Sequence, residues 1–212
     1  MIIAFSFLSL LNENYKEAIM EYNTLTNRDW VHFDVMDGEF VTNTTFGAEL
    51  VKEINTYNKL YSDVHLMCKN PLEEIKQYAK AGAQSITFHY EAVKKEEIML
   101  LINEIRTYEV KVGISIKPGT NVEVLEEYLP YLDNILIMSV EPGKGGQKFI
   151  ESSLDKVKYL RERQNNYHYL ISIDGGINAE TSKLAKQAGV DVIIVGTYLA
   201  NNLNKKTMDD LK

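Results

Sequence analysis

The chain has 212 residues, of which 45% are hydrophobic and 25% charged, a composition that excludes a disordered polypeptide and fits one globular domain over residues 1–212. Its 30 acidic and 23 basic residues give a formal net charge of −7, which argues against nucleic-acid or anionic membrane-surface partners. Cys68 is the only cysteine, so an internal disulfide and a cysteine-rich zinc module are excluded. We expect a cytoplasmic protein, because residues 1–11 lack a basic leader and no apolar run reaches the ~20 residues of a membrane span.

Short β-branched runs alternate with longer amphipathic stretches along the whole chain. Strands are predicted at residues 2–7, 30–35, 61–67, 85–88, 111–116, 134–139, 169–173 and 190–195. Helices are predicted at residues 15–25, 49–55, 72–81, 95–108, 122–128, 154–163 and 179–187, with a short one from residue 205. This alternation is typical of an α/β fold, and eight such units favour a closed (β/α)8 TIM barrel over an open doubly wound sheet. The open sheet stays an alternative, although no Gly-x-Gly-x-x-Gly turn follows the first strand.

Polar side chains share one face of several predicted strands. In the second strand, His32, Asp34 and Met36 alternate with apolar residues, which we expect to face the helices. In the third strand, His65 shares a face with an aspartate and a methionine, and Asp174 stands at the tip of the seventh strand. The polar faces are therefore expected to meet inside the barrel, near the carboxyl ends of the strands.

Four of these groups have the chemistry of a metal site. His32, Asp34, His65 and Asp174 offer two imidazoles and two carboxylates, which suit one Zn²⁺, Fe²⁺ or Mn²⁺ ion without a thiolate. Cys68 lies three residues after His65 and so has the opposite parity, which predicts that it packs outward as a small apolar residue.

Three glycine-bearing loops follow the last three predicted strands. They span residues 141–149, 174–178 and 195–197. Glycines let backbone N–H groups approach an anion, and the loops after the last strands of a barrel commonly build a phosphate site. We therefore expect a phosphate-bearing small molecule, held by backbone dipoles in an acidic protein.

Several long motifs together resemble the ribulose-phosphate 3-epimerase family. They lie at residues 32–38 (HFDVMDG), 63–67 (DVHLM), 138–143 (MSVEPG), 145–149 (GGQKF) and 174–176 (DGG). The resemblance runs from residue 3 to about residue 200, in the family's order. It implies a barrel of the ribulose-phosphate-binding type that interconverts D-ribulose 5-phosphate and D-xylulose 5-phosphate in the pentose phosphate pathway.

The resemblance also implies roles for individual residues. One divalent ion, Zn²⁺ first and otherwise Fe²⁺, Mn²⁺ or Co²⁺, would be bound by the four residues above, with Asp34 and Asp174 as the acid/base pair. The substrate would contact Ser9, Met36, His65, Met67, Met138, Gly143, Gly145, Gly146, Asp174, Gly175, Gly176, Gly196 and Thr197. Association into a homo-oligomer is left open.

The chain departs from the family pattern at Phe5, Thr42, Lys144 and Thr197. Lys144 and the loop after the eighth strand border the region that would distinguish a pentose phosphate from a hexulose phosphate. An epimerase of D-allulose 6-phosphate is therefore an alternative. Three further alternatives are a Schiff-base aldolase using Lys117, a decarboxylase of the orotidine-phosphate type, and a phosphosugar-binding barrel without catalysis. Imidazole at His65, where that decarboxylase has lysine, and the intact pair of aspartates disfavour the last two.

Overall fold

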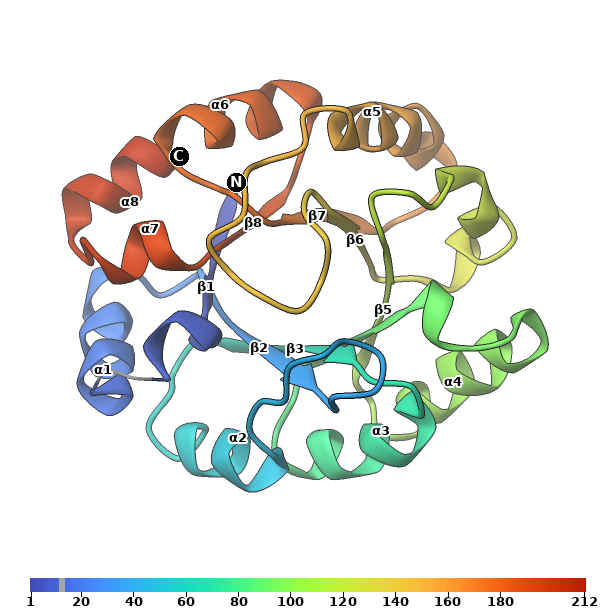
Figure 1. Ribbon diagram of the computed structural model, residues 1–212, viewed down its shortest axis with the longest axis horizontal. Helices are drawn as coiled ribbons and strands as arrows, with labels where there is room; N and C mark the ends of the chain where they lie inside the picture. The colour runs from blue at the N-terminus through green and yellow to red at the C-terminus, as the bar shows by residue number, and fades with distance from the viewer. Residues whose placement is uncertain (12–13) are drawn as a thin grey trace.

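Eight parallel strands close into a barrel in the order of the sequence, in a computed structural model that describes residues 1–11 and 14–212 (Figure 1). This confirms the predicted fold class. The strands are β1 (Ile2–Ser6), β2 (Trp30–Met36), β3 (Tyr61–Met67), β4 (Ser85–His89), β5 (Lys111–Ile116), β6 (Asn134–Met138), β7 (Leu170–Asp174) and β8 (Val192–Val195).

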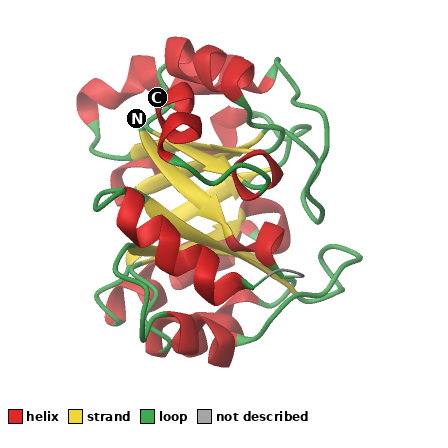
Figure 2. Ribbon diagram, turned by 90° about the vertical axis from the view of Figure 1, so that its left-hand side faces the viewer, coloured by secondary structure: helices red, strands yellow, loops and turns green. Residues whose placement is uncertain are grey.

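Helices surround the barrel, and the loops that follow the strands reach beyond one end of it (Figures 1 and 2). The α-helices are α1 (Tyr15–Leu25), α2 (Ala48–Ile54), α3 (Pro71–Lys80), α4 (Lys95–Thr107), α5 (Ser153–Arg163), α6 (Ala179–Ala188), α7 (Thr197–Ala200) and α8 (Lys205–Leu211). Short 3-10 turns are η1 (Phe7–Leu10), η2 (Tyr90–Ala92), η3 (Val122–Leu125), η4 (Leu129–Tyr131) and η5 (Gln164–Asn166). Within residues 1–11 and 14–212, no helix combines the length and apolarity needed to cross a membrane.

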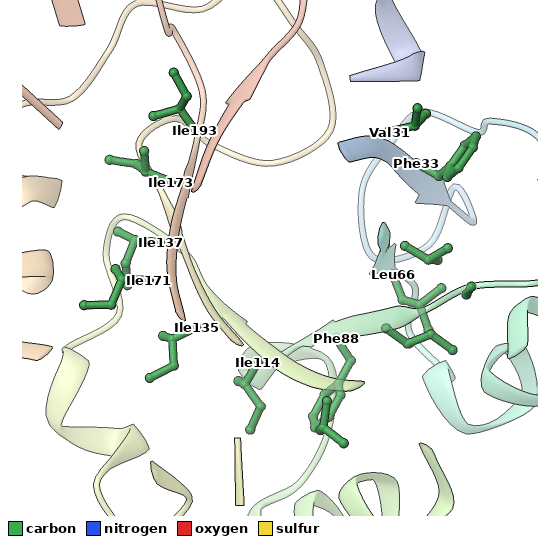
Figure 3. Close-up of a cluster of buried hydrophobic side chains, with 14 of the residues drawn as sticks. Val31, Phe33, Leu66, Phe88, Ile114, Ile135, Ile137, Ile171, Ile173 and Ile193 are labelled. Carbon is green, nitrogen blue, oxygen red and sulfur yellow. The ribbon is translucent and has the colours of Figure 1, made fainter. Parts of the chain in front are cut away.

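Alternation along each strand separates two layers of side chains. The outward layer is apolar and packs against the helices, as Figure 3 shows for Val31, Phe33, Leu66, Ile135 and Ile171. Cys68 belongs to this outer core, as its parity predicts, and its thiol lies 3.7 Å from the Val35 carbonyl oxygen. Burying this apolar layer is the main force that holds the helices to the barrel.

The inward layer combines an apolar cluster, centred on β1, β2, β6 and β8, with buried histidines, aspartates and methionines toward the carboxyl ends of β2 and β3. Ala4, Trp30, Leu136 and Val192 belong to a cluster that fills the lower barrel. Closer to the carboxyl ends of the strands, β2 and β3 pair in a register that places Asp34 beside His65 and Met36 beside Met67. The packed lower layer therefore leaves only the upper end of the barrel for ligands, as in other barrels of this kind.

Two predicted elements differ from the structure. The helix expected at residues 122–128 is wrong: the 3-10 turns η3 and η4 replace it, because the N–H groups of Glu126 and Tyr128 bond carbonyls three residues back instead of four. β8 begins two residues later than expected, because the Val190 N–H still bonds the Ala185 carbonyl and closes α6. The other strand boundaries agree within one residue.

Candidate active site

The four predicted metal ligands meet at the carboxyl ends of three strands. His32 and Asp34 come from β2, His65 from β3, and Asp174 is the last residue of β7. One potential ligand atom from each lies within 4.8 Å of those of the other three. The first three side chains are buried, whereas Asp174 is partly exposed at the cavity.

The ring of His32 is oriented by a carboxylate behind it. Its Nδ1 lies 2.7 Å from Asp63 Oδ2, and Asp63 also accepts a hydrogen bond from the Ser85 hydroxyl. A carboxylate only accepts, so Nδ1 carries a hydrogen. In the neutral ring that metal binding requires, the lone pair of Nε2 then points toward the cluster. That Nε2 is buried without a hydrogen-bond partner among the described residues and lies 3.2 Å from Asp34 Oδ1.

Asp34 is the centre of the cluster. Its Oδ1 lies 3.1 Å from His65 Nδ1, and its Oδ2 accepts a 2.9 Å hydrogen bond from the Ser6 hydroxyl. A buried imidazole nitrogen without a hydrogen-bond partner that faces a carboxylate is satisfied by a positive charge between them, either a proton on the ring or a metal ion. The donor set of two nitrogens and two carboxylates therefore fits a divalent ion.

The pKa values of the cluster show how strongly its groups are coupled. Burial opposes charge on both partners, but the attraction between His32 and Asp34 holds the pKa of His32 above its ordinary value and that of Asp34 below its own. Burial and the charge of Asp34 raise the pKa of Asp174 to about 7. Negative charge thus concentrates on Asp34, where a positive partner is required.

A cavity of about 370 Å³ opens directly above the cluster. Asp34 and Asp174 line it, and so does every predicted substrate residue except His65: Ser9, Met36, Met67, Met138, Gly143, Gly145, Gly146, Gly175, Gly176, Gly196 and Thr197. His65 is fully buried beneath the cavity and does not line it. Lys144 is the only lysine or arginine among the described lining residues. The wall is therefore built mostly from backbone and small side chains rather than from cationic groups.

Two glycines bring backbone close to neighbouring chain at the edge of this cavity. Gly176 has a φ of 64°, and a Cβ there would lie 2.5 Å from the Phe149 nitrogen. At Gly196, a Cβ would lie 2.5 Å from the Ser9 hydroxyl oxygen. The sites accommodate only glycine without rearrangement, so the loops after β6, β7 and β8 pack closely around the space for a ligand.

Two loops lie over the mouth of the barrel in Figure 1, one between β2 and α2 and the other between β6 and α5. The Asn43 side-chain amide donates a 2.7 Å hydrogen bond to the Gly143 carbonyl and joins them. Thr42 and Lys144, two of the positions that depart from the family pattern, lie beside this contact and line an adjoining pocket. These two departures are therefore at the rim of the site and not among the buried ligands.

Three polar residues of the site have functions that the sequence reasoning did not assign. Ser6 bonds Asp34, Asp63 orients His32, and His89 contacts His65. Alternation was the signal available for all three, because each lies on the inward face of its strand. Lys117, in contrast, places its Nζ 4.1 Å from the centre of the Phe40 ring and does not line the cavity, which disfavours a Schiff-base lysine there.

Comparisons with known proteins identify the family of the chain and relate its fold to solved structures. The model described as the ribulose-phosphate 3 epimerase family matches residues 2–200. Ribulose-phosphate 3-epimerase from Mycobacterium leprae (strain TN) is 41% identical over 191 residues, which cover 89% of this chain and 84% of that protein. The protein of the same name from Treponema pallidum (strain Nichols) is 42% identical over 193 residues, covering 89% and 88%. The fold is similar to that of KGPDC from Streptococcus mutans, with a TM-score of 0.72, 15% identity and coverage of 99% and 96%.

Proposed function

Because the chain belongs to the ribulose-phosphate 3-epimerase family and is an epimerase, we propose that it interconverts D-ribulose 5-phosphate and D-xylulose 5-phosphate by inverting C3. The names of the relatives favour the pentose phosphate over D-allulose 6-phosphate. The observation that carries the proposal is that two carboxyl groups from separate strands line one cavity, above a cluster that fits a divalent cation.

Inversion at C3 requires two acid/base groups. The C3 hydrogen is acidic because it is α to the C2 carbonyl, and its removal leaves a flat enediolate that must be protonated on the opposite face. In one direction the Asp34 carboxylate takes the C3 proton and the Asp174 carboxyl group donates its own proton to the other face. Asp34 ends the turnover protonated and Asp174 ionised, and proton exchange restores them. The reverse reaction exchanges their roles.

His32, Asp34, His65 and Asp174 would hold the divalent cation, with Zn²⁺ as the first candidate and Fe²⁺, Mn²⁺ or Co²⁺ as alternatives. When bound, this cation supplies Lewis-acid stabilisation of the negative charge that develops on the substrate oxygens. The methionine side chains at positions 36, 67 and 138 line the floor of the cavity with apolar surface. Excluding water there strengthens every electrostatic interaction in the site.

The far side of the cavity is the proposed phosphate site. Backbone N–H groups of the glycine-bearing loops, with Ser9 and Thr197, would bind the phosphate, and Lys144 would add one positive charge at the rim. This division separates the phosphate from the buried carboxylate of Asp34, whose negative charge would repel it. It also explains how an acidic chain of net charge −7 binds a dianion.

Solvent isotope exchange tests the proposed reaction. Zn²⁺-loaded protein is incubated with D-ribulose 5-phosphate in ²H₂O, and the sugar phosphates are followed by proton NMR. We expect D-xylulose 5-phosphate with deuterium at C3. A product that retains the substrate's C3 hydrogen, or no turnover with any of the four metals, would refute the mechanism. The same assay with D-allulose 6-phosphate, compared by kcat/KM, decides the sugar length.

A further inference from the structure

His89 is a buried histidine next to the proposed ligand His65, and the proposed reaction does not use it. His89 is the last residue of β4 and is fully buried. Its Nε2 lies 2.9 Å from His65 Nε2, and the two ring centres are 4.9 Å apart. Two ring nitrogens at hydrogen-bond distance share one hydrogen, so one ring must donate and the other must accept.

Glu91 determines the direction of that hydrogen bond. Its Oε2 lies 3.2 Å from His89 Nδ1. Its Oε1 accepts hydrogen bonds from the Lys117 backbone N–H, at 2.7 Å, and from the Thr120 hydroxyl. Although burial raises the pKa of Glu91, its hydrogen bonds with His89, Thr120 and the Lys117 N–H together lower it to about 2, so the carboxylate is ionised and only accepts.

The positions of the hydrogens on the rings of His89 and His65 follow from the ionised state of Glu91. His89 donates its Nδ1–H to Glu91, and a neutral ring then has only a lone pair at Nε2. His65 therefore donates from its Nε2, which leaves a lone pair on its Nδ1. That atom is the one that faces Asp34, 3.1 Å away, in the proposed metal cluster. Metal binding requires the same tautomer of His65, because an imidazole nitrogen that binds a metal must be unprotonated.

The two ligand histidines are thus oriented by different means. His32 bonds directly to the carboxylate of Asp63, whereas His65 reaches the carboxylate of Glu91 through a second imidazole. Packing holds this intermediate ring in place: the Phe40 ring centre lies 4.8 Å from that of His89, and the Lys117 Nζ lies 4.1 Å from the same Phe40 ring centre. Glu91 lies in η2, directly after β4, and is not among the residues that line the cavity.

We propose that His89 and Glu91 are positioning residues that set the tautomer of His65 and so prepare its Nδ1 for the divalent cation. The inference rests on the proposed metal site and adds to it a specific outer hydrogen-bond chain. Outer-shell partners of this kind commonly change metal affinity by about 10–100-fold when they are replaced.

Glu91→Gln is the decisive variant because glutamine has nearly the same shape as glutamate but reverses the direction of the hydrogen bonds from residue 91 through His89 to His65. In this variant the Lys117 N–H and the Thr120 hydroxyl would continue to donate to an oxygen, so they would bind the amide oxygen of the glutamine. The amide nitrogen would then face His89 and donate a hydrogen bond to it. His89 would then donate from Nε2, and His65 would be left with its hydrogen on Nδ1. We expect Zn²⁺ affinity, measured by competition with a chromophoric chelator without substrate, to fall about 10–100-fold. Glu162→Gln, on the exposed surface of α5, is the matched control and should leave affinity unchanged.

Imidazole ¹⁵N–¹H correlation spectra of the Zn²⁺-loaded wild-type protein test the tautomers without a variant. We expect hydrogen on Nδ1 of His89 and on Nε2 of His65. Hydrogen on Nε2 of His89 would overturn the proposal even if Glu91→Gln did not fold. Unchanged Zn²⁺ affinity in a folded Glu91→Gln protein would overturn it as well, while normal epimerisation by the wild type would leave the proposed function standing. A wild-type protein that binds no divalent ion would defeat both proposals.

Discussion

The two sides of the cavity solve opposite electrostatic problems. The strand side, formed by His32, Asp34 and His65 on β2 and β3, is buried, and each of its polar groups faces another polar group. The loop side, formed by residues 141–149, 174–178 and 195–197, is more exposed and contains one lysine that lines the cavity. Buried charge is costly unless it is paired, so the strand side needs fixed partners. An anion that arrives from solvent can instead be bound by backbone N–H groups, so the loop side needs glycine and close packing.

The largest effect is expected where the two sides meet, at the carboxyl pair. Asp34→Asn and Asp174→Asn keep the size of each side chain but remove its ability to exchange a proton with C3. We expect kcat to fall by about 10²–10⁴-fold in each variant, measured with D-ribulose 5-phosphate at saturating Zn²⁺. Asp155→Asn, exposed at the start of α5, is the control. Turnover within tenfold of the wild type in either active-site variant would rule out its acid/base role.

Metal removal isolates the strand side. Because the Nε2 lone pair of His32 and the charge of Asp34 face one another, bound Zn²⁺ should stabilise the fold. At 1,000 times the Kd the gain is about 4 kcal/mol, or roughly 8–16 °C in Tm for a domain of this size. Differential scanning calorimetry with and without chelator measures it. Asp34→Asn should abolish the shift, and an equal shift in that variant would place the ion elsewhere.

Gly176→Ala disturbs only the loop side. The left-handed backbone at Gly176 and the approach of the Phe149 backbone should cost about 1–3 kcal/mol in unfolding free energy. We expect KM to rise while Zn²⁺ affinity is retained. Gly47→Ala is the matched control, because a Cβ at Gly47 meets no atom within 4 Å. Loss of Zn²⁺ affinity in Gly176→Ala would show that the two sides are not independent.

Lys144→Gln should have the smallest effect. Lys144 lines the cavity but is exposed, and an exposed charge contact contributes about 0–1 kcal/mol. KM should therefore rise by up to about fivefold at low salt, with kcat unchanged, and the difference from the wild type should vanish at high salt. A fall in kcat of more than tenfold would instead assign Lys144 a direct part in the chemistry.

Alternation along the strands made most of the strand side predictable. It placed His32, Asp34 and His65 on inward faces and Cys68 on the outward face, because side chains in a strand alternate with a period of two. The contacts of Ser6, His89 and Glu91 were not predicted, since they depend on pairing between strands and on a loop that follows β4. The predicted helix at residues 122–128 failed because apolar spacing does not distinguish an α-helix from consecutive 3-10 turns, in which N–H groups bond carbonyls three residues back.

The sequence by itself determined the α/β alternation, the inward and outward faces of each strand, and the family, because these depend on local periodicity and on long motifs. Only the tertiary structure decided the register of β2 against β3, the closure of β8 on β1 and the convergence of Asp174 with Asp34. It also decided which atom of each histidine faces the cluster. That depends on hydrogen-bond partners up to 31 positions away, whose distance in the sequence says nothing about their distance in space.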